Sequence, residues 1–142
     1  MFDELTKYKH TDHFFFKSTD SLKDECNAPT DKSGLYVVYA LKQGNIELIY
    51  IGSSGKLEAD GTMHIRKAGL GGIKDMIVNG HQFGKSPRQQ SWPNQMKFEN
   101  IEALDVYWYV THNNKYQDCP EILERQLLKN HKDFYGSLPR WN

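Results

Sequence analysis

Long hydrophobic runs, clustered cysteines and a net charge are all missing from this sequence. Because a transmembrane helix needs about 20 apolar residues and no apolar stretch here exceeds a few, we expect no membrane span. No apolar segment follows Met1, so we also expect no secretory signal. The two cysteines, Cys26 and Cys119, lack C-x-x-C spacing and indicate reduced thiols in a cytoplasmic protein, not a disulfide scaffold or zinc site.

The balance of charge excludes a polybasic, histone-like protein, since 18 basic side chains face 18 acidic ones in 142 residues. A hydrophobic content of 38% is enough for a packed core. The length fits one domain, because single domains usually hold about 100–200 residues. Basic side chains nevertheless gather in residues 61–97, where Asp75 is the one acidic residue. This stripe predicts a phosphate-binding face, with an ordinary solvated surface as the alternative.

A β-hairpin is the clearest structural signal. Residues 34–41 and 46–52 are rich in β-branched and aromatic side chains, and a short polar stretch separates them. A three-residue loop over 43–45 would place Tyr36 and Tyr50 on the same face of the sheet, whereas a two-residue loop would place them on opposite faces. We predict the three-residue loop.

The last helix has clear start and stop signals. Asp118 is expected to cap it, with Pro120 in the first turn and Glu121 completing a capping-box pattern. Gly136 is expected to end it. The packed face is predicted at Leu123, Leu127, Asn130 or His131, and Phe134.

The other segments are assigned from local composition and periodicity. They are an N-terminal extension over 1–33 with a short strand or core plug at 14–16 and a helical turn or two over 20–26, a loop over 53–61, a helix broken by glycines over 62–79, irregular chain over 80–100, and a half-buried strand over 104–110. The order of elements predicts an α+β fold, a small antiparallel sheet flanked by helices.

Five features of the chain follow one another in an order known from a nuclease family. The predicted hairpin carries Gly34-Leu35-Tyr36 on one strand and Tyr50-Ile51-Gly52 on the other. Arg66 follows on the next predicted helix, Glu124 lies within Leu-Glu-Arg-Gln-Leu-Leu on the last helix, and Asn142 ends the sequence. With these motifs the chain resembles the GIY-YIG nuclease superfamily, in its restriction-endonuclease-like or homing-like branch.

The resemblance covers residues 34–142, the predicted nuclease domain, and has three departures from the family pattern. Leu35 stands in the middle of the first motif, and thirteen residues separate the two motif tyrosines. Leu70 stands where many relatives carry a histidine. Lys67 and His64 are candidates to replace that histidine.

The resemblance implies a metal-dependent endonuclease that hydrolyses phosphodiester bonds in double-stranded DNA. Glu124 would hold one Mg²⁺ or Mn²⁺ ion per site, and Tyr36 would act as general base or position the attacking water. Tyr50 would orient water or phosphate, Arg66 would grip two phosphate oxygens, and Asn142 would brace the site. The alternatives are structural: tyrosines packed in the core, a solvated glutamate, a surface ion pair and a frayed terminus.

The basic segment over residues 71–100 resembles the recognition insertions of the restriction branch. Amide and guanidinium side chains can read base edges in the major groove. The predicted nucleic-acid contacts are Lys74, Lys85, Arg88, Gln90, Trp92 and Lys97. A polar loop packed on its own domain is the alternative.

Cleavage of both strands with one site per chain predicts a homodimer, which could form only on DNA. Three other hypotheses remain open at this point. One is a nucleic-acid-binding module that has lost catalysis, another is a repair or mobile-element nuclease that needs a partner, and the third is an α+β scaffold protein.

Overall fold

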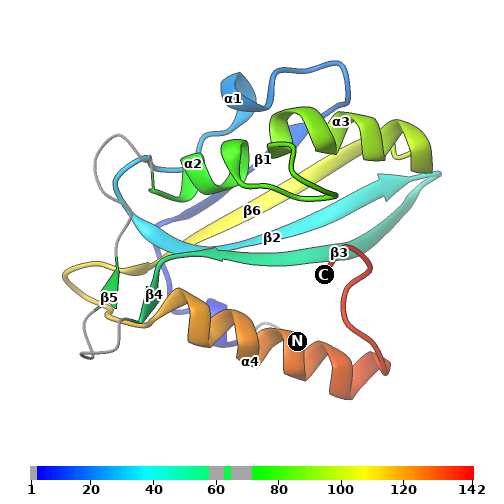
Figure 1. The fold of residues 1–142 in the computed structure, drawn as a ribbon. Helices are drawn as coiled ribbons and strands as arrows, with labels where there is room; N and C mark the ends of the chain where they lie inside the picture. The colour runs from blue at the N-terminus through cyan, green and yellow to red at the C-terminus, as the bar shows by residue number, and fades with distance from the viewer. Residues whose placement is uncertain (1–2, 58–62, 65–71) are drawn as a thin grey trace.

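A computed structural model describes residues 3–57, 63–64 and 72–142 of the chain. Its centre is a four-stranded antiparallel sheet in the order β1-β6-β2-β3 (Figure 1). The strands are β1 (Thr11–Phe16), β2 (Ser33–Lys42), β3 (Asn45–Ser54) and β6 (Ala103–His112). A separate two-stranded ribbon pairs β4 (Lys56–Leu57) with β5 (Met63–His64). The predicted α+β class and antiparallel sheet are confirmed.

Helices cover both faces of the sheet (Figure 1). On one face lie α1 (Leu22–Glu25), α2 (Gly72–Asn79) and α3 (Arg88–Glu99), and on the other lies α4 (Pro120–Tyr135). A short 3₁₀ helix, η1 (Asp3–Leu5), precedes β1. None of the described helices is long and apolar enough to cross a lipid bilayer.

Each face of the sheet has its own hydrophobic core, because side chains alternate between faces along a strand. On β6 the even-numbered residues from Leu104 to Val110 face α1, α2 and α3, where Trp92 and Met96 also pack. The opposite core contains Leu35 and other side chains of β2 and β3 packed against Leu123 and Leu127 of α4. The face of the sheet to which a strand side chain points therefore decides whether it packs against α1, α2 and α3 or against α4.

The hairpin turn is shorter than predicted, so the three-residue loop is wrong. Lys42 pairs with Asn45, and the two turn residues Gln43 and Gly44 both have positive φ, of 51° and 78°. Positive φ at both central positions is the requirement of a type I′ turn, whose twist matches that of the strands. This turn alone would have placed the two motif tyrosines on opposite faces.

A β-bulge in β3 reverses that outcome. The register shifts between Val38 and Tyr39, so that Tyr39 pairs with Leu48 while Val38 pairs with Tyr50, and Ile49 is the extra residue. One extra residue restores the parity that the shorter turn removed. Tyr36 and Tyr50 therefore share a face, as predicted, but for a different reason.

The N-terminal segment belongs to the same sheet and cores. β1 pairs with β6 over its whole length, which confirms the strand predicted at residues 14–16. Tyr8 packs in the core beneath α4, and Leu22 packs in the core on the other face. Residues predicted as an extension thus supply an outer strand and part of both cores.

Residues 53–100 differ most from the predictions. β3 continues through Ser54, and Met63–His64 is a strand rather than part of a helix, although α2 confirms the helical end of that segment. The irregular assignment of residues 80–100 is wrong, because α3 occupies most of it. α3 contains Pro93 and has no side-chain bond at its N-cap, so its local signals are weak. Burial of Trp92 and Met96 compensates for them.

The N-cap prediction for α4 is also wrong. The cap residue is Cys119, which makes no side-chain cap bond. The Asp118 carboxylate instead accepts a hydrogen bond of 2.5 Å from Tyr8 Oη and pairs with Lys7 at 2.9 Å. Gly136 ends the helix in the left-handed conformation, as predicted. Phe134, however, is exposed, since the buried stripe runs through Leu123, Leu127 and His131.

Candidate functional site

The two motif tyrosines meet on the sheet face beneath α3. Their ring centroids lie 5.9 Å apart, and Tyr36 is only 1% exposed. A side chain at Gly52 would collide with the Tyr36 phenol, so this position requires glycine. Gly52, the last residue of the second motif, therefore makes room for the Tyr36 ring.

Arg88 is the residue that joins the two tyrosines. Its Nη2 donates to Tyr50 Oη at 3.1 Å, and its guanidinium lies 5.5 Å from the Tyr36 ring centre and 5.3 Å from that of Tyr50. Nη1 donates to the Met76 carbonyl at 2.6 Å, and Nε donates to Gln82 Oε1 at 2.9 Å. All three nitrogens are therefore bonded, and every acceptor is neutral.

This arginine is a buried cation. It is 4% exposed, and within residues 3–57, 63–64 and 72–142 no carboxylate forms an ion pair with it. Neutral acceptors and aromatic faces solvate a guanidinium without cancelling its charge. The described partners of Arg88 therefore do not neutralise its charge beside the hydroxyl of Tyr50.

Burial dominates the protonation of Tyr36. Removal from water raises the pKa of its phenol well above the ordinary value of 10, and the nearby Arg88 cation lowers that pKa only in part. A hydrogen bond with Tyr50 and the Glu124 charge raise the pKa further. In this state Tyr36 stays protonated at neutral pH, which suits hydrogen bonding to a water or phosphate oxygen better than proton abstraction.

Glu124 reaches the same end of the sheet from α4. Its Oε1 accepts a hydrogen bond of 3.0 Å from Ser53 Oγ, one residue beyond the second motif. Burial raises the pKa of its carboxyl above 4.5, while Ser53 and, more weakly, Arg88 oppose this rise. Glu124 therefore lies within electrostatic range of both Arg88 and Tyr36, although α4 and α3 lie on opposite faces.

Asn142 extends the outer edge of β3. Its Oδ1 accepts from the Ile51 amide at 3.0 Å and its Nδ2 donates to the Ile51 carbonyl at 2.9 Å. The Trp141 amide donates to the Ile49 carbonyl at 2.8 Å. The tail thus pairs backbone N–H and C=O groups at the outer edge of β3, among them both groups of Ile51, the central residue of the second motif.

Three further catalytic residues were predicted. Arg66 and Lys67 lie outside the described residues. His64 lies on β5, where its backbone pairs with Lys56. The structure thus brings together Tyr36, Tyr50, Glu124 and the bracing Asn142.

The predicted nucleic-acid contacts divide into two groups. Lys85, Gln90 and Lys97 are exposed, and Lys74 is half-buried on α2. Arg88 and Trp92 lie inside the protein, because they form the stripe of α3 that packs on the sheet. The predicted surface role of these two residues is therefore not supported by their placement.

Gln82 and Ser53 are site residues that the sequence reasoning missed, and Arg88 was predicted as a nucleic-acid contact but not as a partner of the tyrosines. The spacing of Arg88, Trp92 and Met96, every fourth residue, is that of one helix face. That periodicity is the signal that could have indicated a buried arginine. No local pattern relates Gln82 or Ser53 to the tyrosines.

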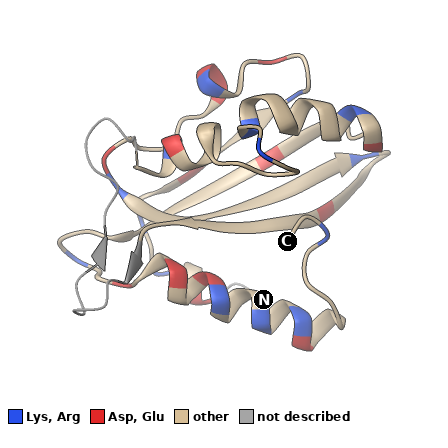
Figure 2. Ribbon diagram, viewed as in Figure 1, with Lys and Arg blue, Asp and Glu red and all other residues tan. Residues whose placement is uncertain are grey.

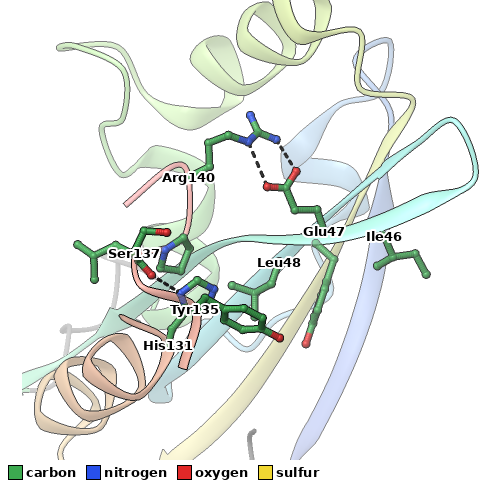
Figure 3. A pocket seen from close by; sticks show the side chains of 10 residues that line it. Ile46, Glu47, Leu48, His131, Tyr135, Ser137 and Arg140 are labelled. Carbon is green, nitrogen blue, oxygen red and sulfur yellow. Dashed lines mark hydrogen bonds and ion pairs between the residues drawn. The ribbon is translucent and has the colours of Figure 1, made fainter. Parts of the chain in front are cut away.

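One pocket lined by described residues lies away from this cluster. It has a volume of about 830 Å³ and lies between β3, the end of α4 and the tail (Figure 3). Its His131 donates Nδ1–H to the Ser137 carbonyl at 2.7 Å, and its Arg140 binds Glu47. Its polar groups hold the tail, and none of the predicted catalytic residues lines it.

A metal ion at Glu124 would have few protein ligands. The part of the chain that the structure describes holds no group of three His, Cys, Asp or Glu side chains suited to a metal. Mg²⁺ is commonly held by one or two carboxylates together with water and substrate phosphate. The Glu124 carboxylate beside the Ser53 hydroxyl fits such an open site.

Acidic and basic residues are interspersed along α4 (Figure 2). Arg125 follows Glu124 directly, and Glu121 lies one turn earlier. Arg125 binds Glu121 at 2.6 Å, so these two neighbours are engaged with each other. Glu124 alone of the three bonds to the sheet through Ser53. The three residues provide a matched set for mutagenesis.

No protein-family model matches this chain, and comparison with curated proteins and with solved structures finds no significant match.

Proposed function

We propose that this protein is a divalent-metal-dependent endonuclease that hydrolyses phosphodiester bonds in double-stranded DNA. The observation that carries the proposal is the meeting of Tyr36, Tyr50 and the Arg88 cation beneath α3, within electrostatic range of Glu124. These groups come from four elements, far apart in the sequence. They match the tasks of the reaction, which are orientation of water, neutralisation of charge and coordination of a metal.

Each residue has a task in the proposed reaction. The Tyr36 and Tyr50 hydroxyls orient the attacking water and a phosphate oxygen by hydrogen bonds. Arg88 stabilises the negative charge that develops on the phosphate, which a cation surrounded by neutral acceptors can still do. Glu124, with Ser53 beside it, holds Mg²⁺ or Mn²⁺, which when bound would also neutralise phosphate charge.

Arg88 takes in this proposal the place that the sequence assigns to Arg66. Its support is direct contact with Tyr50 and proximity to Tyr36. Arg66, Lys67 and His64 stay predictions as further phosphate contacts.

The finer assignment is a GIY-YIG-like, site-specific enzyme of the restriction type that acts as a homodimer. A two-fold dimer suits a two-fold DNA site, because each copy then cuts one strand. The exposed Lys85, Gln90 and Lys97 are the proposed DNA contacts of the α2–α3 region.

The test is cleavage of supercoiled plasmid and genomic DNA in Mg²⁺, in Mn²⁺ and in EDTA. We expect discrete metal-dependent products from the wild type and none from Glu124→Gln. Glu121→Gln is the matched control, one turn earlier on α4, and it should cleave like the wild type. Cleavage that persists in Glu124→Gln would reject the metal site.

The burial of Tyr36 and Arg88 favours a second candidate, a nucleic-acid-binding module without catalysis. Reacting groups need contact with substrate, and these two side chains are 1% and 4% exposed. Binding of duplex DNA in EDTA, with no cleavage of diverse DNAs in either metal, would favour this second function over the first.

A further inference from the structure

We infer that Gln82 is a positioning residue that aims the Arg88 guanidinium at Tyr50, and that Trp141 of the tail holds Gln82 in place. This inference rests on the proposed nuclease function. It concerns the contacts behind the cluster, which the motif resemblance does not include.

Gln82 joins three segments of the chain through one side-chain amide. Its Oε1 accepts from Arg88 Nε and from Trp92 Nε1, both at 2.9 Å, and its Nε2 donates to the Trp141 carbonyl at 3.2 Å. Two N–H donors converge on the same amide atom, so that atom must be the oxygen. The orientation of the amide is therefore set by its neighbours.

The contacts of Arg88 show why Gln82 controls its direction. A guanidinium is planar, so bonds at two of its nitrogens fix where the third one points. Gln82 binds Nε and the Met76 carbonyl binds Nη1, which leaves Nη2 directed at Tyr50 Oη. Loss of the Gln82 oxygen would leave a buried N–H of a cation unsatisfied and free the plane to turn.

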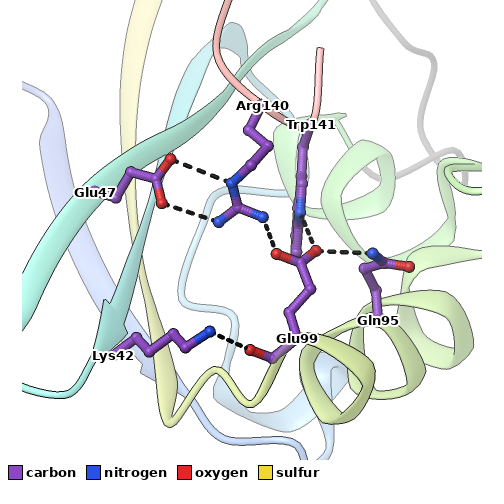
Figure 4. A network of polar contacts seen from close by, with 6 residues as sticks. All are labelled: Lys42, Glu47, Gln95, Glu99, Arg140 and Trp141. Carbon is purple, nitrogen blue, oxygen red and sulfur yellow. Dashed lines mark hydrogen bonds and ion pairs between the residues drawn. The ribbon is translucent and has the colours of Figure 1, made fainter.

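The tail residue that holds Gln82 is itself firmly attached. Trp141 Nε1 donates to Glu99 Oε2 at 2.8 Å, and Gln95 donates to the same oxygen at 2.7 Å (Figure 4). Arg140 pairs with Glu99 as well, and the Trp141 ring lies against Trp92 with centroids 6.2 Å apart. The Trp141 carbonyl is thus anchored to α3, the helix that begins with Arg88.

The same tail is bonded to the strand that carries Tyr50. The Trp141 amide binds the Ile49 carbonyl, and Asn142 binds Ile51. The tail therefore fixes β3 and Gln82 relative to each other. This geometry couples the position of Tyr50 to that of its arginine partner.

The first experiment measures steady-state cleavage by Gln82→Met, Gln82→Glu and Gln89→Met. Gln82→Met has a similar shape but no acceptor, so kcat should fall by roughly 10–100-fold, the usual cost of removing a supporting hydrogen bond at a metallo-enzyme site. KM should change by less than about twofold. Gln82→Glu keeps an oxygen for both donors, but it places a carboxylate on the Arg88 cation and loses the donor to the Trp141 carbonyl, so its kcat should stay as low as that of Gln82→Met.

Gln89→Met is the control. Gln89 follows Arg88 on α3, is exposed, and bonds only to Asn79 among the side chains described. Its kcat should equal that of the wild type. A Gln82→Met enzyme with kcat within twofold of the wild type would overturn the inference.

The second experiment does not depend on cleavage. In NMR spectra, Gln82→Met should shift both the Arg88 Nε–H and Trp92 Nε1–H signals and speed exchange of the arginine proton, while Gln89→Met should leave both unchanged. Unchanged signals in Gln82→Met would reject Gln82 as the positioning residue. A wild type that cleaves no DNA would reject the proposed function, and these signals would still decide whether Gln82 holds Arg88.

Discussion

Arg88 and Arg140 are two arginines with opposite surroundings in one small fold. Arg88 is 4% exposed, and its acceptors among the described residues are all neutral: a carbonyl, an amide oxygen and a phenol. The Arg140 side chain is 42% exposed and pairs with two carboxylates, those of Glu47 and Glu99. The more deeply buried arginine is thus the one without a compensating charge among the described residues.

The difference indicates two uses of the same side chain. The carboxylates cancel the charge of Arg140, which serves to attach the tail to β3 and α3. The partners of Arg88 among the described residues are neutral and do not compensate its charge, which is costly for stability unless the charge has another use. An incoming phosphate would be such a use.

The largest effect is expected from replacing the buried arginine. Arg88→Met should lower the cleavage rate by roughly 100–1,000-fold, as expected when a donor to developing negative charge is removed. Arg88→Lys keeps the charge but lacks the planar fork, so its rate should lie between those of Arg88→Met and the wild type. Single-turnover cleavage measures both. A rate for Arg88→Met within tenfold of the wild type would contradict the catalytic use of its charge.

The second-largest effect is expected from removing the Tyr50 hydroxyl, which accepts a hydrogen bond from Arg88. Tyr50→Phe removes the acceptor of Nη2 but keeps the packed ring, and we expect a rate reduction of about 10–100-fold with little loss of fold. Tyr39→Phe, on the opposite face of the neighbouring strand, is the control and should cleave normally. If Tyr39→Phe slowed cleavage as much as Tyr50→Phe, the loss of rate would come from a general disturbance of packing and not from the missing Tyr50 hydroxyl.

The third prediction concerns Glu124 and the pH dependence of stability. Burial raises the pKa of Glu124 above 4.5, so the folded state disfavours its charged form. Its stabilising contribution is therefore complete below the unfolded-state pKa and is lost as pH rises through the higher folded-state pKa. Glu124→Gln should melt a few degrees above the wild type at pH 7.5 without divalent metal, since one kcal/mol corresponds to roughly 3 °C.

At pH 3.5 the advantage of Glu124→Gln should disappear, because wild-type Glu124 is then protonated. Circular dichroism melts at both pH values measure the difference. Glu121→Gln removes a partly exposed pair with Arg125 together with a repulsion of Glu124, two small effects that oppose each other, so it should show no gain at either pH. An equal gain at both pH values would mean that burial of charge is not its source.

The smallest effect is expected at the paired arginine. Arg140→Met should lower the free energy of unfolding by about 1 kcal/mol or less, the usual contribution of partly exposed ion pairs. Trp141 and Asn142 still hold the tail, so the cleavage rate should stay within twofold of the wild type. Urea titration and plasmid cleavage check the two quantities. A larger kinetic than thermodynamic effect would place Arg140 in the reaction and remove the contrast with Arg88.

Local patterns in the sequence determined most of the secondary structure. Strand alternation over residues 104–110, the β-branched runs of the hairpin and the glycine after α4 each act within a few residues, so their outcome can be read without the fold. The shared face of Tyr36 and Tyr50 was also predicted, although the turn behind that prediction was wrong. The bulge that corrects it depends on pairing with neighbouring strands, which local patterns do not reveal.

Tertiary structure alone decided the features that local signals left weak or misassigned. α3 forms although it contains Pro93, because Trp92 and Met96 are buried in a core that they share with side chains of the sheet. Asp118 leaves the cap because Tyr8 and Lys7, 110 or so positions away, compete for its carboxylate. Arg88 joins Tyr50 because α2 packs on β2 and β3 and α3 packs beside α2, which brings the first residue of α3 to β3. The tyrosines and Glu124 were visible as motifs, but their arginine and its support through Gln82 and Trp141 are long-range contacts that exist only once the layers have assembled.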